Sequence, residues 1–344
     1  MTSPHQAVGR LPSRLWSWGR RHWLLALCAA CILLVSGIYT YLQTPVLWFV
    51  CVEPGVVPGY EEAGPNRIMI VAPHPDDDIL GAGGTMAEAA AAGASVLVVY
   101  LTNGDANRAA RRVITMNPFH IPAQYRALGT RREKEAVLAL QRLGLPRGSA
   151  VFLNYPDRGL AELLEDHWSP DDPYTSRFTN RDAKYSARAF NPVAQYCGTN
   201  VVADLAFILG RYRPTILYLP HPEDAHPDHR AGYQVGMLAL ETAGIPAAEF
   251  VPPAIRCYLV HLFEERWPVP GGVHVSLPLS ILPASIAAEP WHSAVLSEWA
   301  VQAKLASIRA HYSQWLTSRG FLAAFARTNE LYVSSTDLPK LPVE

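Results

Sequence analysis

Short apolar segments alternate with helical segments over most of the chain, and this alternation restricts the possible folds more than any other feature. The apolar segments contain almost no polar alternation and are typical of strands: 67–73, 95–104, 150–157, 215–222 and 254–263. Helices are expected at 81–94, 124–145, 200–214, 229–244 and 297–315. Strands of this kind are buried on both faces. The sequence therefore predicts an α/β fold, Rossmann-like and doubly wound, with a mostly parallel sheet and helices on both faces.

The beginning of the chain has a different character. Trp23–Leu42 is a run of 20 residues without a charge, the length that a helix needs to cross a bilayer. Four arginines precede it and no Lys or Arg follows before Arg67, so the positive-inside rule favours a cytoplasmic N-terminus. We therefore predict a single-pass membrane protein with these parts: a basic cytoplasmic segment (1–22), a transmembrane anchor (23–42), a linker (43–64) and an extracytoplasmic domain (65–344). A cleaved signal peptide is the alternative, although its apolar core is usually shorter.

Histidines and acids gather directly after two of the predicted strands. His74 and Asp76–Asp78 follow the first strand in the sequence PHPDDD, and the fourth strand leads into PHPEDAHPDHR, Pro220–Arg230. In a doubly wound sheet, ligands bind beyond the carboxyl ends of the strands. Neighbouring carboxylates are costly to bury unless a cation compensates them. The two loops therefore predict one divalent metal ion, and imidazole with carboxylate suits Zn²⁺ best, although other divalent metals accept the same ligands.

The same region argues against a nucleotide. Gly-Ala-Gly-Gly at 81–84 lacks the G-x-G-x-x-G spacing, and three aspartates stand where a pyrophosphate would need backbone donors. The net charge of -1 also lacks the basic footprint of phosphate-backbone recognition. We expect neither a nucleotide nor a nucleic acid as a partner.

The paired motifs PHPDDD and HPDH resemble those of the PIG-L/LmbE-like N-acetylglucosaminyl deacetylases, whose pattern is Ala-His-Pro-Asp-Asp-Glu with a downstream His-Pro-Asp-His. The resemblance covers residues 68–263. It implies a Rossmann-like zinc hydrolase that removes an acetyl group from an amino sugar. The zinc ligands that it implies are His74, Asp77 and His229.

The resemblance also implies roles for residues around the metal. The residues implied for catalysis are Asp76 as general base, His226 as the group that meets the tetrahedral intermediate, and Asp228 as the partner of His226. Contacts with sugar hydroxyls are implied for Arg132 and Asp157.

Elementary chemistry supports these roles. Zinc lowers the pKa of its water to about 7, which supplies the nucleophile that an amide requires. The carboxylate of Asp76, next to a ligating carboxylate, could take that proton, a step typically worth about 10² to 10⁴ in rate. A protonated His226 held by Asp228 could then donate to the developing oxyanion.

Three positions depart from the family pattern. Asp78 stands where the family usually has Glu, Pro73 replaces the usual Ala, and Asp224 stands where some members carry a mobile tyrosine. The identity of the substrate therefore follows less directly than the metal.

Other polar residues have simpler interpretations. His221 and Glu223 are expected in a turn with a solvated imidazole, and His311 is expected to be structural. The polar and aromatic segment 167–196 is long enough to be a lid or a wall of the substrate site. The side chains that could stack on a sugar there are Trp168, Tyr174, Phe178 and Tyr185.

The leading functional hypothesis is a membrane-anchored, zinc-dependent N-deacetylase acting on an N-acetylglucosaminyl conjugate, which could be lipid- or polymer-linked. Two alternatives remain: an amidase for another acyl conjugate, and a non-catalytic, metal-stabilised carbohydrate-binding domain. Asp76 beside Asp77 favours an enzyme, because a purely structural metal site needs no base next to its ligand.

Overall fold

The computed structural model describes residues 22–35, 37, 57–59, 61–246, 249–262, 267–268, 273–279, 286 and 289–338. The chain divides into two compact units, Met1–Phe49 and Val50–Glu344. Everything that concerns the site lies in the second unit.

The described part of the first unit contains one helical stretch, at 22–35. Among the described residues, no helix combines the length and apolar character that crossing a membrane requires. This finding contradicts the predicted anchor at 23–42 and the extracytoplasmic placement that depended on it. Residues 36 and 38–42 of that segment, 1–21 and most of 43–64 lie outside the described residues.

Seven strands of the second unit form a single sheet in the order β3-β2-β1-β4-β5-β7-β6. Their bounds are β1 (Arg67–Ala72), β2 (Ser95–Thr102), β3 (Ala150–Tyr155), β4 (Ile216–Pro220), β5 (Ala254–Tyr258), β6 (His292–Val295) and β7 (Asn329–Ser334). β1 to β5 pair in parallel, whereas β7 is antiparallel to both β5 and β6. All five predicted strands are present, so the mostly parallel α/β fold is confirmed.

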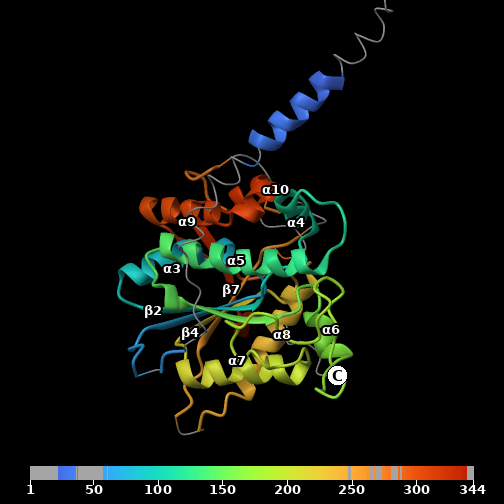
Figure 1. Cartoon of the computed structure of the whole chain (residues 1–344). Helices are drawn as coiled ribbons and strands as arrows, with labels where there is room; N and C mark the ends of the chain where they lie inside the picture. Colours follow the sequence, from blue (N-terminus) through green and yellow to red (C-terminus); the bar gives the residue numbers. More distant parts are fainter. Residues whose placement is uncertain are drawn as a thin grey trace, which may run out of the picture. The chain divides into compact units, whose positions relative to one another are not determined.

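Helices cover both faces of this sheet. Their bounds are α3 (Asp77–Ala91), α4 (Arg108–Thr115), α5 (Pro122–Arg142), α6 (Leu160–Glu165), α7 (Gly198–Tyr212), α8 (Pro227–Glu241), α9 (Glu298–Ala310) and α10 (Tyr312–Ala323). α3, α5 and α9 pack together on one face, and α7 and α8 pack together on the other (Figure 1). The predicted helix at 297–315 is therefore two helices, which meet at His311.

The core under α7 and α8 explains why the strands are apolar throughout. Met69, Val71, Val99 and Leu219 point to this face and are fully buried, and they belong to one continuous apolar cluster. Alternate residues such as Ile70 and Val98 are equally buried on the opposite face. Burying one such side chain stabilises the fold by roughly 1.5–3 kcal/mol. The loops at the carboxyl edge are thus held by strands that are packed on both sides.

The long segment 167–196 is tied down along its length. Lys184 Nζ lies 2.5 Å from Asp204 Oδ2 on α7, and both side chains are buried. The hydroxyl of Tyr185 donates to Asp105, 2.9 Å away. These buried contacts make the segment a wall that is packed against the domain.

Candidate active site

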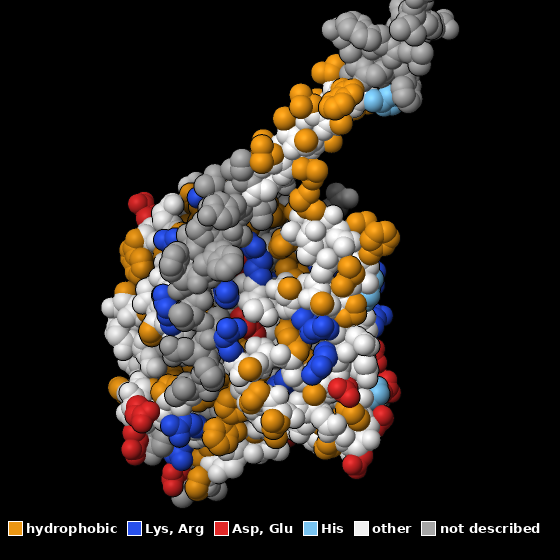
Figure 2. All heavy atoms as spheres, in the orientation of Figure 1, with side chains coloured by type: hydrophobic (Ala, Val, Ile, Leu, Met, Phe, Trp, Pro, Cys, Tyr) orange, Lys and Arg blue, Asp and Glu red, His pale blue; other side chains and the backbone are white. Residues whose placement is uncertain are grey.

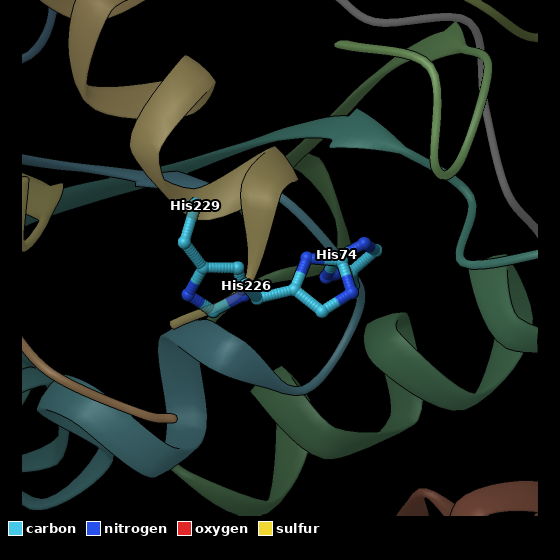
Figure 3. A group of neighbouring side chains, drawn as sticks. All are labelled: His74, His226 and His229. Atoms are coloured by element: carbon cyan, nitrogen blue, oxygen red, sulfur yellow. The ribbon is translucent and has the colours of Figure 1, made fainter. Parts of the chain in front are cut away.

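The two predicted loops meet at the carboxyl edge of the sheet. β1 and β4 are neighbours, and the chain leaves them toward opposite sides of the sheet, which is the arrangement that forms a ligand crevice. His74 follows β1, and His226 and His229 lie at the start of α8 (Figure 3). The three ring centroids lie 4.8, 5.3 and 5.4 Å from one another. The structure therefore brings the two sequence motifs into one site.

The carboxylate of Asp77 contacts both of the predicted histidine ligands, and one nitrogen each of His74, His226 and His229 lies within 4.8 Å of the other two. Oδ2 of Asp77 lies 3.1 Å from Nδ1 of His74 and 3.0 Å from Nε2 of His229. Ligand atoms around a tetrahedral zinc ion with bonds of about 2.1 Å lie about 3.4 Å apart. Nε2 of His229 is buried and faces Oδ2 of Asp77. The donor set therefore fits a divalent cation.

The second nitrogen of each imidazole contacts a carboxylate. Nδ1 of His229 lies 3.0 Å from Oδ2 of Asp224, and Nε2 of His74 lies 3.1 Å from Oδ2 of Asp228. Such carboxylates fix the tautomer and the orientation of a metal-ligating histidine. Asp224 was noted in the sequence only as a departure from the family pattern. Its partner on α8 could not be recognised before the loop was folded.

The charges of the site are set by mutual contact. Burial opposes protonation of His229, but Asp224 and Asp77 outweigh it and raise the pKa of His229 to about 10. For Asp77, burial acts to raise the pKa, because it disfavours the charged carboxylate. His229 and His74 outweigh this effect and lower the pKa well below its ordinary value. The two histidines thus keep the Asp77 carboxylate ionised, and a metal ion bound at this point would take the place of the proton on His229, because a ligating imidazole is neutral.

Asp76 has a different environment from its neighbour. Burial raises its pKa to about 7, against the opposing effect of Arg132. A carboxylate that titrates near neutral pH is suited to general acid–base work. Its backbone φ of 141° is rare for a residue other than glycine, which marks a constrained position between β1 and α3.

Arg132 holds Asp76 in place. Its Nη2 donates to Oδ1 of Asp76 at 3.1 Å and to the carbonyl of Pro75 at 2.6 Å, and its Nη1 donates to the carbonyl of Gly104 at 2.7 Å. The side chain is buried, although it lines the pocket described below. The structure thus shows Arg132 in contact with Asp76, and the contact with a sugar hydroxyl stays a prediction.

His226 and Asp228 are related differently from the prediction. The carboxylate of Asp228 accepts hydrogen bonds from the backbone N–H groups of Arg158 and Leu160 and contacts His74, and none of its described contacts reaches the ring of His226. Instead the backbone N–H of Asp228 donates to Nδ1 of His226 at 3.2 Å. Burial and the neighbouring histidines lower the pKa of His226 to about 2. The predicted contact between the His226 ring and the Asp228 carboxylate is thus wrong, and burial with a backbone donor at Nδ1 favours a neutral imidazole whose proton is on Nε2.

Asp157 also lies at this site. Its Oδ1 is 3.3 Å from Nε2 of His74, and its Oδ2 accepts from the backbone N–H of Ala106 at 2.7 Å. Burial opposes ionisation, but His74 outweighs it and lowers the pKa of Asp157. Asp157 lines the pocket, so it can contact both His74 and a bound molecule.

Two further histidines have environments that the sequence did not indicate. His221 is fully buried, with Nε2 2.9 Å from Glu289, so the predicted solvated turn is wrong at this residue. His261, just beyond β5, packs its ring 4.7 Å from that of His229 and stacks on Phe321 at 5.5 Å. Only the parallel pairing of β4 with β5 brings His261 to the same edge as His229.

A pocket of about 1040 Å³ opens onto these residues. His74, Asp76, Asp77 and Asp157 line it on one side, and residues of α10 such as Phe321 line it on another. Of the four aromatic residues expected in the 167–196 segment, Phe178 lines the pocket. The volume is that of a small-molecule site with a few convergent polar groups.

A family model described as PIG-L, GlcNAc-PI de-N-acetylase, matches residues 69–240. The chain belongs to this family. The match spans β1 to α8 and so contains all the residues of the candidate metal centre. The resemblance seen in the two sequence motifs is confirmed, and with it the class of the enzyme, an N-deacetylase.

Curated relatives agree with this assignment. A 1D-myo-inositol 2-acetamido-2-deoxy-alpha-D-glucopyranoside deacetylase from Nocardioides sp. is 28% identical over 279 residues, which cover 75% of this chain and 86% of that protein. A second deacetylase of this name from Saccharopolyspora erythraea is 30% identical over 218 residues, covering 62% of this chain and 66% of the relative.

Solved structures share the fold at lower identity. The N,N'-diacetylchitobiose deacetylase from Pyrococcus horikoshii has a TM-score of 0.50 and 20% identity, and the match covers 89% of this chain and 96% of that chain. GalB, the 4-carboxy-2-hydroxymuconate hydratase from Pseudomonas putida KT2440, also has a TM-score of 0.50, with 14% identity over 81% of this chain and 99% of that chain. Since a hydratase has the same fold, the fold alone does not define the reaction.

Proposed function

We propose that this member of the family is a zinc-dependent hydrolase that removes the acetyl group from an N-acetylated amino sugar. The observation that carries the proposal is the contact of Asp77 Oδ2 with both His74 Nδ1 and His229 Nε2, next to a separate carboxylate, Asp76. The names of the curated relatives support an N-acetylglucosaminyl conjugate as the substrate class.

His74, Asp77 and His229 would hold the metal. A divalent ion bound there supplies a Lewis acid for the amide carbonyl and lowers the pKa of water. Asp224 and Asp228 would keep the two imidazoles in the tautomers that direct their lone pairs toward the ion.

The remaining residues would manage protons and charge. Asp76, held by Arg132, takes a proton from the attacking water and returns it to the leaving amine, so the C–N bond breaks to give acetate and a free amino sugar. Nε2–H of His226 donates a hydrogen bond to the oxygen that becomes negative in the tetrahedral intermediate. Because His226 is neutral, it needs no proton from solvent to act as this donor.

The proposal is tested with four variants of the purified chain. Asp77→Ala and His229→Ala each remove a ligand, so they should lower both metal content and turnover. Asp76→Asn and His226→Ala should keep the metal and lower turnover by roughly 10² or more. Metal stoichiometry, thermal unfolding and acetate release from a panel of N-acetylated amino sugars are measured together.

Three results would contradict the proposal. Full acetate release from metal-free protein would remove the role of the ion. Binding of the sugars by metal-loaded protein without any acetate release would identify a binding domain instead. Release of a longer acyl group in preference to acetate would identify the alternative amidase.

A further inference from the structure

His261 forms part of the pocket wall, although it lies outside both sequence motifs. It follows β5 and lines the pocket together with His226 and Phe321. Its ring centroid lies 4.7 Å from that of His229 and 5.4 Å from that of His226, the two histidines that Figure 3 shows beside His74. A group bound between the candidate metal position and His226 therefore has the imidazole of His261 beside it.

Both the backbone and the ring of His261 are fixed. Its backbone N–H donates to Oδ2 of Asp224 at 3.0 Å, and its carbonyl accepts from the backbone N–H of Ala225 at 2.9 Å. In the side chain, Nδ1 lies 3.5 Å from Oδ1 of Asp224, and the ring stacks on Phe321 with centroids 5.5 Å apart and planes 18° apart. Only 17% of the side chain is exposed. The ring is therefore a rigid boundary, because moving it would disrupt its contacts with both Asp224 and Phe321.

The pocket has a closed side and an open side. Next to His261, the closed side contains Phe321 and the buried Leu322. Elsewhere the lining includes Arg158 and Arg177, which are exposed. On the face shown in Figure 2, Lys and Arg side chains likewise lie across the middle of the globular unit. An amino sugar is larger and more polar than its acyl group, so the sugar suits the open side and the acyl group suits the closed side.

From this arrangement we infer that His261, supported by Phe321, limits the length of the acyl group that the site accepts. The inference rests on the proposed deacetylase function and specifies it, because it makes the selection of acetyl over longer acyl groups the work of one side chain. With the carbonyl oxygen at His226, the methyl group of an acetamide would meet the imidazole of His261, and a longer chain would overlap it. Dense packing around the ring leaves it no space to move aside. His261 lies beyond residues 69–240, so the family match does not contain it.

The test measures the binding of three methyl glycosides of glucosamine, which carry an N-acetyl, an N-propionyl or an N-butyryl group. The parent protein is the full chain with Asp76→Asn, in which turnover does not consume the ligand. We expect it to bind the acetyl compound roughly tenfold or more tightly than the butyryl compound. Adding His261→Ala opens the boundary, so the butyryl compound should then bind at least as tightly as the acetyl compound. Adding His261→Phe keeps a ring that can stack on Phe321, so the preference for acetyl should remain.

A matched control removes a similar imidazole elsewhere. His292 stacks on Tyr332 with centroids 5.3 Å apart, and its Nε2 lies 3.9 Å from Asp337, but it does not line the pocket. His292→Ala should therefore keep the preference for acetyl. Thermal unfolding and metal content are measured for every variant, because the ring of His261 also packs against that of His229. His261→Ala should fold and keep its metal.

Several outcomes would overturn the boundary. They are equal or tighter binding of the butyryl compound by the parent protein, an unchanged preference in His261→Ala, and a lost preference in His261→Phe or His292→Ala. Loss of metal from His261→Ala would make His261 a ligand instead, and failure of all three compounds to bind would also overturn the inference. Because binding is the readout, the boundary can be overturned while acetate release by the wild type persists. It can equally stand if the wild type releases no acetate, which would contradict the proposed function alone.

Discussion

The imidazole of His229 lies between two carboxylates, with Nδ1 3.0 Å from Asp224 and Nε2 3.0 Å from Asp77. Asp224 also accepts hydrogen bonds from the backbone N–H groups of His226, Val260 and His261. It therefore joins the loop after β4 to the end of β5 and fixes the ring that faces the candidate metal position.

Asp224→Asn tests this orientation. The asparagine keeps the size of the side chain but no longer holds the Nδ1 proton of His229 with a negative charge. We expect metal affinity to fall roughly 10- to 100-fold, as for other residues that orient a ligating histidine. Competition with a chelator measures this affinity. Asp171→Asn, an exposed carboxylate on the 167–196 segment, is the control and should bind metal like the wild type. Unchanged metal affinity in Asp224→Asn would show that the carboxylate is dispensable.

The pKa of Asp76 leads to a prediction for the pH profile. As a base Asp76 must be ionised, and its pKa is raised to about 7, so kcat/KM should increase as pH rises through this value. A bound cation would favour the carboxylate and move this limb to lower pH. Arg132 also favours the carboxylate, so Arg132→Gln should move the limb to higher pH. The measurement is kcat/KM as a function of pH for the wild type and for Arg132→Gln. If kcat/KM rises over the same pH range in both proteins, Arg132 does not influence the ionisation of Asp76.

Glu133 should make stability depend on pH. Burial raises its pKa to about 7, although Asn103 donates to its Oε1 at 2.6 Å. The folded state thus binds the proton more tightly than the unfolded state, and the stability that this provides is present below about pH 4.5 and lost as pH rises through 7. Glu133→Gln resembles the protonated form, so it should be more stable than the wild type at pH 8, with a smaller difference at pH 5. Denaturant unfolding at both pH values measures this. The exposed Glu165→Gln should show no such trend.

Gly104 and Gly93 form a matched pair for testing the close packing of the Arg132 guanidinium against the backbone at residue 104. Both have a positive φ, 60° and 82°, so alanine is strained at either position by roughly 1–2 kcal/mol. A Cβ atom at Gly93 meets open space, whereas one at Gly104 overlaps the guanidinium of Arg132. Gly104→Ala should therefore destabilise the protein more than Gly93→Ala, and it should also lower turnover because Arg132 no longer holds Asp76. Equal unfolding free energies and equal turnover in the two variants would argue against this packing of Arg132 on Gly104.

Much of the fold follows from local sequence pattern. The five parallel strands are apolar on both faces, and each is short and bounded by helix signals, so each could be predicted on its own. The meeting of His74 with His229 followed from the rule for the carboxyl edge. β6 and β7 were missed because their pairing is antiparallel and joins segments about 35 residues apart, and β6 is largely exposed.

Side-chain partners within the site were predicted less well. Asp228 lies two positions after His226, yet its carboxylate contacts His74 and the backbone at 158–160. The partners of the Asp228 carboxylate depend on where the loop after β3 lies. The sequence HPDH contains no information about the position of that loop. The charge-free run at 23–42 has the length of an anchor, but among the described residues no helix is both long and apolar enough to cross a membrane.

The pocket is formed by two stretches of chain, of which one matches the family model and the other lies beyond the match. The metal centre lies wholly within residues 69–240, the part that matches the family model, whereas Phe321 and the other α10 residues that close the pocket lie beyond it. The part of the pocket wall formed by α10 can therefore differ among relatives without a change at the candidate metal centre. Relatives that share the first part can retain one chemistry while an altered C-terminal wall, formed by α10, changes which acetylated compound is admitted.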